Sequence, residues 1–316
     1  MQTRPLGRNG PNLSVVGLGA WAMGGDGWMG SWGPQDESES IATIHAALDA
    51  GINWIDTAPI YGLGRSEEVV GKAIASRRDE VFVATKVTNR WHEDRSLFRS
   101  GAADSIVAEC DQSLARLGIE HIDLLQVHQP PTDVPIEETW TALADLQDAG
   151  KVRHLGLSNA SVDDHERCLA IRHVDSTQPH YNLLLRGIED GILDLCGDHG
   201  IGVIPYGPMY EGLLSGTFDP ARLEGDDFRK KDEWQPRIVT ALSAVELLRD
   251  VAEGFGMTVG QLSIAWVLGD PRISSAIVGA RRPAQVEQNA AVGHRDIDLA
   301  AVRAAVDAAV AELLSA

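Results

Sequence analysis

Short apolar segments alternate with helix-like segments along nearly the whole chain, and this alternation limits the fold more than any other feature. Continuous apolar strands joined by helical crossovers are typical of a parallel sheet that is covered on both faces. The predicted strands are residues 12–19, 52–56, 80–86, 122–128, 152–158, 174–178, 201–206 and 275–279.

A helical segment follows each of these strands, and eight strand–helix units predict an α/β fold of the (β/α)8 TIM-barrel type. We expect one domain over residues 1–316, with an extra helix at 298–314. Residues 209–237 form the one long irregular segment, and loops of that length inside a compact domain are usually functional, often as lids. The predicted helices are 35–50, 66–76, 100–117, 136–149, 162–171, 188–199, 240–254, 259–268 and 283–292.

Charge and cysteine content limit the partners and the compartment. The formal net charge is −19, which argues against nucleic acid and anionic membranes as partners, because these are bound by clustered Lys and Arg. The 3 cysteines form no CxxC motif, and the histidines lack metal-ligand spacing, so we expect neither disulfides nor a metal site. Without an apolar signal segment at the N-terminus or a membrane-length apolar run, we expect a cytoplasmic protein.

Active sites of parallel barrels lie at the C-terminal ends of the strands. Asp56, Lys86 and His128 end the second, third and fourth predicted strands, and Tyr61 follows on the loop after Asp56. Nearly every other strand also ends in a polar or small residue that would lie at the same rim. These strand-end residues are Gly19, Ser158 with Asn159, Gln178, Tyr206 and Gly279.

Four of these residues make a plausible acid–base unit. Hydride addition to a carbonyl carbon leaves negative charge on oxygen, which then needs a proton, and Tyr61 can donate one. A free phenol has a pKa of about 10, and we expect the ammonium of Lys86 to lower it, with Asp56 holding the lysine in place. His128 would orient the carbonyl or help to pass the proton.

Motifs over nearly the whole chain resemble the aldo-keto reductase superfamily, in particular its bacterial branch with inositol-associated and potassium-channel β-subunit-like members. They lie at residues 53–71, 82–87, 123–129, 150–159 and 178–183. The resemblance implies a (β/α)8 barrel whose bottom is closed by an N-terminal hairpin, here at 3–16. It also implies a catalytic tetrad of Asp56, Tyr61, Lys86 and His128, with Tyr61 as the acid.

The same resemblance implies a nicotinamide cofactor site. Ser158, Asn159 and Gln178 would bind the carboxamide and Tyr206 would stack on the ring, next to the strand end at Gly19, Ala20 and Trp21. Residues 17–22 also fit G-x-G-x-x-A, but no helix is predicted to open there, as a Rossmann site requires. The pyrophosphate would lie along the backbone of Gly207, Pro208, Gly212 and Leu213, and the adenosine end along residues 279–289, with Asn289 at the adenine.

The adenosine segment departs from one well-known form of the family. That form begins with Lys-Ser and has an Arg six residues after the Lys, where this chain has Gly279-Ala280 and Gln285. Arg281 and Arg282 follow instead, as in a bacterial branch, and guanidinium groups suit a 2′-phosphate. This pattern favours NADP(H) and leaves NAD(H) possible; a solvated arginine pair at a helix start is the alternative. Gln288 stands where the family usually has a Glu.

Tryptophans on the predicted loops over the barrel mouth are candidates for substrate walls, although packing is the alternative for each. They are Trp28, Trp32, Trp91 and Trp234. The favoured function is interconversion of an aldehyde or ketone and its alcohol. The alternatives are a sugar, inositol or other polyol dehydrogenase working in the oxidative direction, and a cofactor-binding regulatory subunit without turnover. The identity of the small-molecule substrate and the oligomeric state stay open.

Overall fold

Eight parallel strands make the central sheet of the computed structural model, which describes residues 1–315. Each strand lies beside the next barrel strand of the chain, in the order β11-β10-β9-β8-β5-β4-β3-β12. Parallel bridges from Val203 to Ile273 and from Tyr206 to Ile277 join the two ends of the sheet, so the (β/α)8 prediction is confirmed. The strands are β3 (Val16–Gly19), β4 (Trp54–Asp56), β5 (Phe82–Val87), β8 (Ile122–Val127), β9 (Val152–Ser158), β10 (Ser176–Gln178), β11 (Gly202–Val203) and β12 (Ala276–Gly279).

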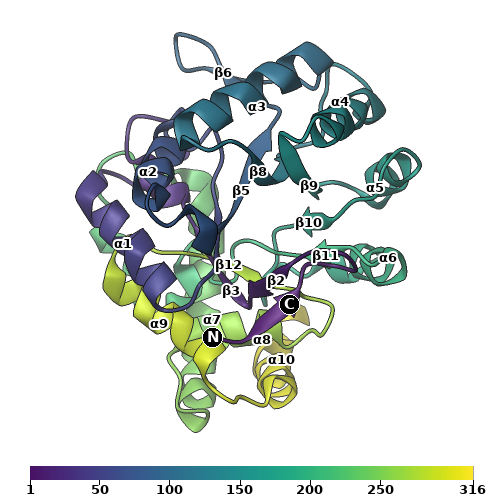
Figure 1. Cartoon of the computed structure of the whole chain (residues 1–316). Coiled ribbons are helices and arrows are strands. Elements are labelled where there is room, and N and C mark those ends of the chain that lie inside the picture. The colour runs from purple at the N-terminus through teal and green to yellow at the C-terminus, as the bar shows by residue number, and fades with distance from the viewer. Residues whose placement is uncertain (316) are drawn as a thin grey trace.

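Helices surround these strands in a ring, as Figure 1 shows. Local sequence explains several of their starts: Ser161 and Thr258 form capping boxes with the residues three positions later, Asp164 and Gln261. The helices are α1 (Glu37–Asp49), α2 (Arg65–Ile74), α3 (Ala103–Leu117), α4 (Ile136–Asp148), α5 (Val162–Leu169), α6 (Ile192–His199), α7 (Gln235–Gly254), α8 (Val259–Leu268), α9 (Pro283–His294) and α10 (Leu299–Ser315).

The N-terminal hairpin closes one end of the barrel. The predicted strand 12–19 is two strands, because β1 (Thr3–Pro5) pairs antiparallel with β2 (Asn12–Ser14) before β3 begins. Leu6 and Leu13 of this hairpin pack inside the barrel with Trp54, and the indole N–H of Trp54 donates to Ser275 Oγ at 3.0 Å. The hairpin therefore fills the barrel interior at this end.

Four other predicted elements differ from the structure. The third loop contains a hairpin of β6 (Asn89–Trp91) and β7 (Leu97–Arg99). The helix predicted at 188–199 is broken at Gly191, with φ 105°, into η3 (Gly187–Glu189) and α6. A one-turn 3₁₀ helix, η1 (Trp21–Gly24), follows β3 where only a loop was expected. The predicted strand 201–206 is a regular strand only at β11, and beyond it Tyr206 forms isolated bridges to His180 and Ile277.

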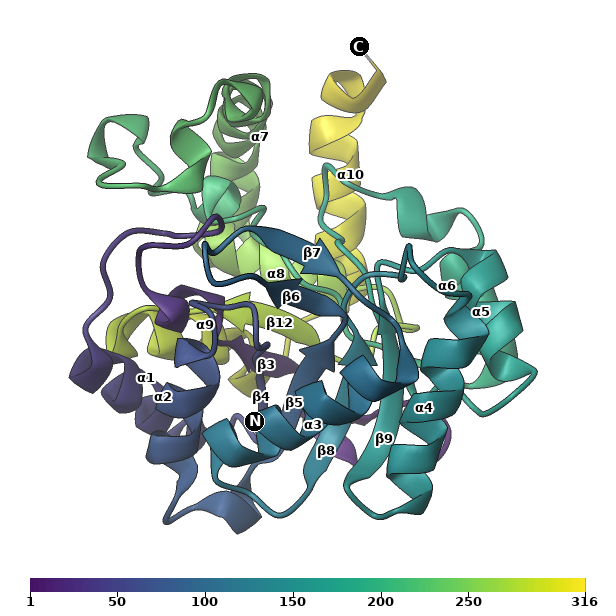
Figure 2. The same cartoon turned by 90° about the horizontal axis from the view of Figure 1, so that it is seen from above.

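The seventh loop carries more local structure than its composition suggests. Its 3₁₀ turns are η4 (Leu213–Ser215), η5 (Pro220–Arg222), η6 (Phe228–Lys230) and η7 (Asp232–Trp234), and α7 begins at Gln235 rather than at 240. The loop contacts the first loop: Ser31 Oγ donates to Asp226 Oδ1 at 2.6 Å, and the Phe228 amide donates to the Ser31 carbonyl. Figure 2 shows both loops on the same side of the barrel as β6 and β7.

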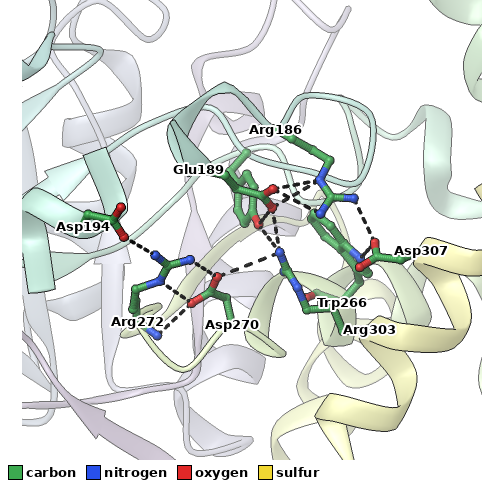
Figure 3. Close-up of polar contacts among 9 residues, drawn as sticks. Arg186, Glu189, Asp194, Trp266, Asp270, Arg272, Arg303 and Asp307 are labelled. Atoms are coloured by element: carbon green, nitrogen blue, oxygen red, sulfur yellow. Dashed lines mark hydrogen bonds and ion pairs between the residues drawn. The ribbon is translucent and has the colours of Figure 1, made fainter. Parts of the chain in front are cut away.

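An ion-pair network fixes the terminal helix α10 to the barrel (Figure 3). Arg303 donates to Glu189 at 2.6 Å and lies 4.3 Å over the ring of Trp266. Arg186 lies 5.0 Å from the same ring and donates to Asp307 at 2.9 Å. Two guanidinium groups thus hold one indole between α10 and the segment after β10, which makes the predicted terminal helix part of the core.

Across residues 1–315, no single helix is long and apolar enough to span a membrane. The segments Asp232–Gly254 and Val259–Leu268 are long and apolar enough only when taken together, and the chain bends by 84° between them.

Candidate active site

Lysine 86 is the centre of the predicted acid–base unit. It lies near the end of β5 with its side chain fully buried, beside Asp56 at the end of β4. Its Nζ donates to Asp56 Oδ1 at 2.6 Å, to the Thr57 carbonyl at 2.9 Å and to the Tyr61 hydroxyl at 3.3 Å. The buried ammonium therefore joins the carboxylate to the phenol, as the strand-end argument predicted.

The second oxygen of Asp56 is held by two glutamines. Gln178 Nε2 donates to Asp56 Oδ2 at 2.7 Å, and Gln126 Nε2 lies 3.4 Å from the same oxygen. Gln178 Nε2 also donates to Gln126 Oε1 at 3.2 Å. Gln126 was missed from the sequence, although a signal exists: it lies two residues before His128, and alternate residues of a strand share a face.

His128 faces the phenol from the end of β8. Its ring meets the Tyr61 ring edge-on, with centroids 5.8 Å apart at 87°. Burial, and then the nearby charges of Lys86 and Arg99, lower the pKa of His128 well below its usual value, so the imidazole is neutral at pH 7. Its Nδ1 is buried without a hydrogen-bond partner among the described residues.

The pKa of Tyr61 corrects one expectation. We expected the lysine to lower it, but burial, followed by the charges of Asp56 and Tyr206, raises it well above the usual 10. Burial also lowers the pKa of Lys86, which outweighs the attraction of Asp56. The phenol is therefore protonated in the resting protein. The contact with Lys86 mainly stabilises the phenolate that forms when the proton leaves.

The residues predicted to bind a carboxamide converge beside His128. Ser158 Oγ donates to the Gln178 carbonyl at 2.8 Å, and Asn159 Nδ2 donates to Ser158 Oγ at 3.0 Å and to the His128 carbonyl at 3.1 Å. The Tyr206 hydroxyl donates to Asn159 Oδ1 at 2.9 Å. Asn159 adopts φ 55°, a left-handed conformation that Asn tolerates better than most residues. The side-chain hydrogens of these residues are all donated within the cluster, so a planar amide placed here would replace some of these hydrogen bonds with its own.

Gly279 leaves open space at the end of its strand, beside Gly19. Gly19 and Gly279 are register partners at the ends of β3 and β12. A Cβ atom added at Gly279 would meet nothing nearer than the Gly19 carbonyl, at 4.0 Å. A nicotinamide dinucleotide would fit this open space together with the polar groups beside His128, and their binding roles stay a prediction.

Comparison with known proteins identifies the family. The sequence profile of the Aldo/keto reductase family matches residues 15–309. The chain belongs to the aldo/keto reductase family. It is accordingly an oxidoreductase of carbonyls and alcohols, from a family whose members use nicotinamide cofactors.

Individual members of the aldo/keto reductase family match over most of their length. "Aldo-keto reductase YhdN" of Bacillus subtilis (strain 168) is 42% identical over 91% of this chain and 87% of its own length. "NADH-specific methylglyoxal reductase" of Escherichia coli (strain K12) is 36% identical over 92% and 93%. The solved structure of the glycerol dehydrogenase AKR11B4 from Gluconobacter oxydans superposes with a TM-score of 0.88 at 37% identity, over 99% and 96%.

The two arginines of the adenosine segment have different surroundings in this aldo/keto reductase. Arg281 Nε donates to Gln35 Oε1 at 2.8 Å, and its other nitrogens donate to the carbonyls of Trp32 and Pro34. Arg281 thus holds the first loop. The Arg282 side chain is 70% exposed, which leaves it accessible to a phosphate.

The remaining residues that were predicted to bind the cofactor differ in their contacts and burial. Gln285 Oε1 accepts the Arg281 amide at 2.8 Å, and Asn289 Nδ2 donates to the Gly279 carbonyl at 3.3 Å. Gly207 and Gly212 adopt φ 68° and 83°. Pro208 and Leu213 are buried. Ala20 is buried and donates its amide to the Asp56 carbonyl.

Aromatic rings cover the tetrad. Trp28 lies tilted against Tyr61, with centroids 6.1 Å apart, and Trp91 packs on the same small cluster from β6. The guanidinium carbon of Arg229 lies over the ring of Trp32, 4.3 Å from the ring centroid. Trp234 is buried, and its ring packs edge-on against Phe228, which is also buried and was not singled out from the sequence.

Proposed function

We propose that this protein is an NADP(H)-dependent oxidoreductase that interconverts an aldehyde or ketone and its alcohol, with Tyr61 as the general acid and base. The observation that carries this proposal is the buried Lys86 ammonium, which is shared between Asp56 at 2.6 Å and the Tyr61 hydroxyl at 3.3 Å.

The cofactor supplies the hydride, and the side chains manage the proton. Tyr61 gives its proton to the carbonyl oxygen as negative charge develops there. The phenolate that remains lies beside the Lys86 ammonium, and Asp56 keeps that ammonium charged and in place. A neutral imidazole at His128 donates or accepts one hydrogen bond without adding charge, which suits it to orient a carbonyl oxygen.

The preference for NADP(H) rests on Arg282. Its guanidinium is exposed at the start of α9, where it can bind a 2′-phosphate through two parallel hydrogen bonds. A 36% identical relative is named as NADH-specific, so the cofactor choice has to be measured with both dinucleotides.

A polyol dehydrogenase working in the oxidative direction is the second candidate. The 37% identical glycerol dehydrogenase favours it, and the same four side chains catalyse both directions by microscopic reversibility. Methylglyoxal and glycerol, taken from the names of two relatives, are the first substrates to compare.

A cofactor-consumption screen tests the proposal. Purified protein is incubated with NADPH or NADH and a panel of aldehydes, ketones and sugars, and with NADP⁺ or NAD⁺ and glycerol, inositols and other polyols. We expect turnover of at least one carbonyl, with NADPH preferred over NADH by roughly tenfold or more in kcat/KM. Tight NADPH binding without turnover of any compound would contradict the enzyme proposal and favour a cofactor-binding regulatory protein.

A further inference from the structure

A histidine and a glutamate lie beside Tyr206, the residue proposed to stack on the nicotinamide ring. The His180 ring stacks on the Tyr206 ring, with centroids 4.7 Å apart and an angle of 14°. His180 Nε2 lies 3.2 Å from Glu211 Oε1. The other carboxyl oxygen, Oε2, is buried without a hydrogen-bond partner among residues 1–315. A buried carboxyl thus touches the ring that supports the proposed nicotinamide platform.

The backbone holds this carboxyl in place. Glu211 adopts φ 51°, and its carbonyl accepts a hydrogen bond from Arg229 Nη1 at 2.9 Å. Gly207 leaves room for the pair, since a Cβ there would come within 2.6 Å of His180 Nε2. Non-glycine residues with positive φ are uncommon and persist where surrounding contacts require them. The contact between His180 and Glu211 is therefore built into the loop.

Burial sets the charge of the pair. It raises the pKa of Glu211 to about 8 and lowers the pKa of His180 to about 4, so both groups are neutral at pH 7. In that state the carboxyl O–H can donate to His180 Nε2. As the pH rises through 8, the carboxyl becomes a carboxylate. The other charged or titratable groups that act on the pair are Arg229, Arg237, Tyr206 and Tyr210.

We propose that Glu211, acting through His180 and Tyr206, sets the relative affinity of this protein for the oxidised and the reduced nicotinamide. The inference rests on the proposed function, in which Tyr206 stacks on the nicotinamide ring. That ring carries a positive charge when oxidised and none when reduced. A carboxylate behind the stack attracts the oxidised form and has little effect on the reduced form, whereas a neutral carboxyl does not discriminate between them.

The expected size follows from Coulomb's law. Two unit charges separated by two stacked rings, roughly 8–10 Å, in a medium between water and dry protein change an affinity about fivefold. The ratio of the two dissociation constants is the right quantity to measure. Both cofactor forms carry the same phosphates, so ionisation of the phosphates cancels from the ratio.

The test measures dissociation constants for NADP⁺ and NADPH by quenching of tryptophan fluorescence, at several pH values between about 6.5 and 9. In the unmodified protein we expect the ratio Kd(NADP⁺)/Kd(NADPH) to fall about fivefold over this range. In Glu211→Gln, which cannot ionise, the ratio should stay constant. NAD⁺ and NADH replace the phosphorylated pair if the protein binds those more tightly.

Glu109→Gln is the matched control. Glu109 is also buried, with a pKa raised to about 7, but it lies on α3 and accepts the Thr88 amide at 3.0 Å. This variant should keep the pH dependence of the unmodified protein. Any contribution of Lys86 to the pH dependence of this ratio is the same in all three proteins, because none of them changes that residue.

Two results would overturn the inference while leaving the proposed function intact. One is a ratio in the unmodified protein that does not change with pH, a measurement that does not depend on how well the variant folds. The other is the same fall in Glu211→Gln as in the unmodified protein. Failure of all four cofactors to bind would instead contradict the proposed function itself.

Discussion

The indole ring of Trp21 lies parallel to the phenol ring of Tyr61, with centroids 5.7 Å apart and an angle of 6°. The ring of Phe228 also lies parallel to the indole, with centroids 5.8 Å apart and an angle of 10°. The indole N–H donates to the Gly30 carbonyl at 2.8 Å. Rings from the first, second and seventh loops thus form one stack, and the proposed acid owes part of its position to the two loops that cover it.

Replacing Trp21 tests this stack. We expect Trp21→Ala to lower kcat about tenfold or more, because a displaced catalytic group loses reactivity steeply. Trp21→Phe keeps an aromatic face against Tyr61 and should stay within about threefold of the unmodified protein. Steady-state kinetics on a small aldehyde measure both. Equal losses in the two variants would show that ring stacking does not position the phenol.

The pH dependence of the two directions should differ. The pKa of Tyr61 is raised well above 10 and that of His128 is lowered well below its usual value. Below the pKa of Tyr61 nearly every phenol carries the proton that reduction needs, so kcat for reduction should be nearly constant from roughly pH 6 to 9. Oxidation needs the phenolate, whose fraction rises about tenfold per pH unit, so its rate should rise with pH.

Initial rates in both directions across that range check this difference. A reduction rate that falls by half or more between roughly pH 6 and 8 would mean that a group with a near-neutral pKa, and not Tyr61, limits the reaction.

The two arginines of the adenosine segment should respond differently to substitution. Arg282→Gln removes an exposed guanidinium, and we expect NADPH to bind about tenfold more weakly while NADH is unaffected, because only NADPH carries the 2′-phosphate. Arg281→Gln breaks contacts to Trp32, Pro34 and Gln35 and should lower the melting temperature and weaken both cofactors. Binding titrations with the two dinucleotides separate the cases. Parallel losses for NADPH and NADH in Arg282→Gln would contradict the assignment.

The catalytic rim was predictable because its signal is local. Asp56, Lys86 and His128 each come at the end of an apolar run, and parallel strands bring such positions to one rim whatever the loops do. The helix at 259–268 was also predicted to the residue, since its residues are nearly all apolar and its capping residue Thr258 directly precedes it.

Features that depend on distant contacts were not predictable. The strand predicted at 12–19 divides because Asn12–Ser14 pairs with a strand before it, a choice that the apolar pattern alone does not show. Phe228 and Glu211 acquire their surroundings only when the seventh loop folds against Trp21 and His180. The raised pKa of Tyr61 likewise follows from burial, which outweighs the neighbouring lysine.

The proton-donor role of Tyr61 is the central claim, and Tyr61→Phe tests it most directly. The substitution removes one hydroxyl and keeps the ring that stacks on Trp21. Tyr210→Phe is the control, since Tyr210 is a buried tyrosine that packs against Trp234 instead.

We measure kcat/KM for a reducible carbonyl and the dissociation constant of NADPH in both variants. The account predicts that Tyr61→Phe lowers kcat/KM by a factor of about 10²–10⁴, while NADPH binding stays within about threefold and Tyr210→Phe remains active. A Tyr61→Phe protein that reduces carbonyls as fast as the unmodified protein would contradict it.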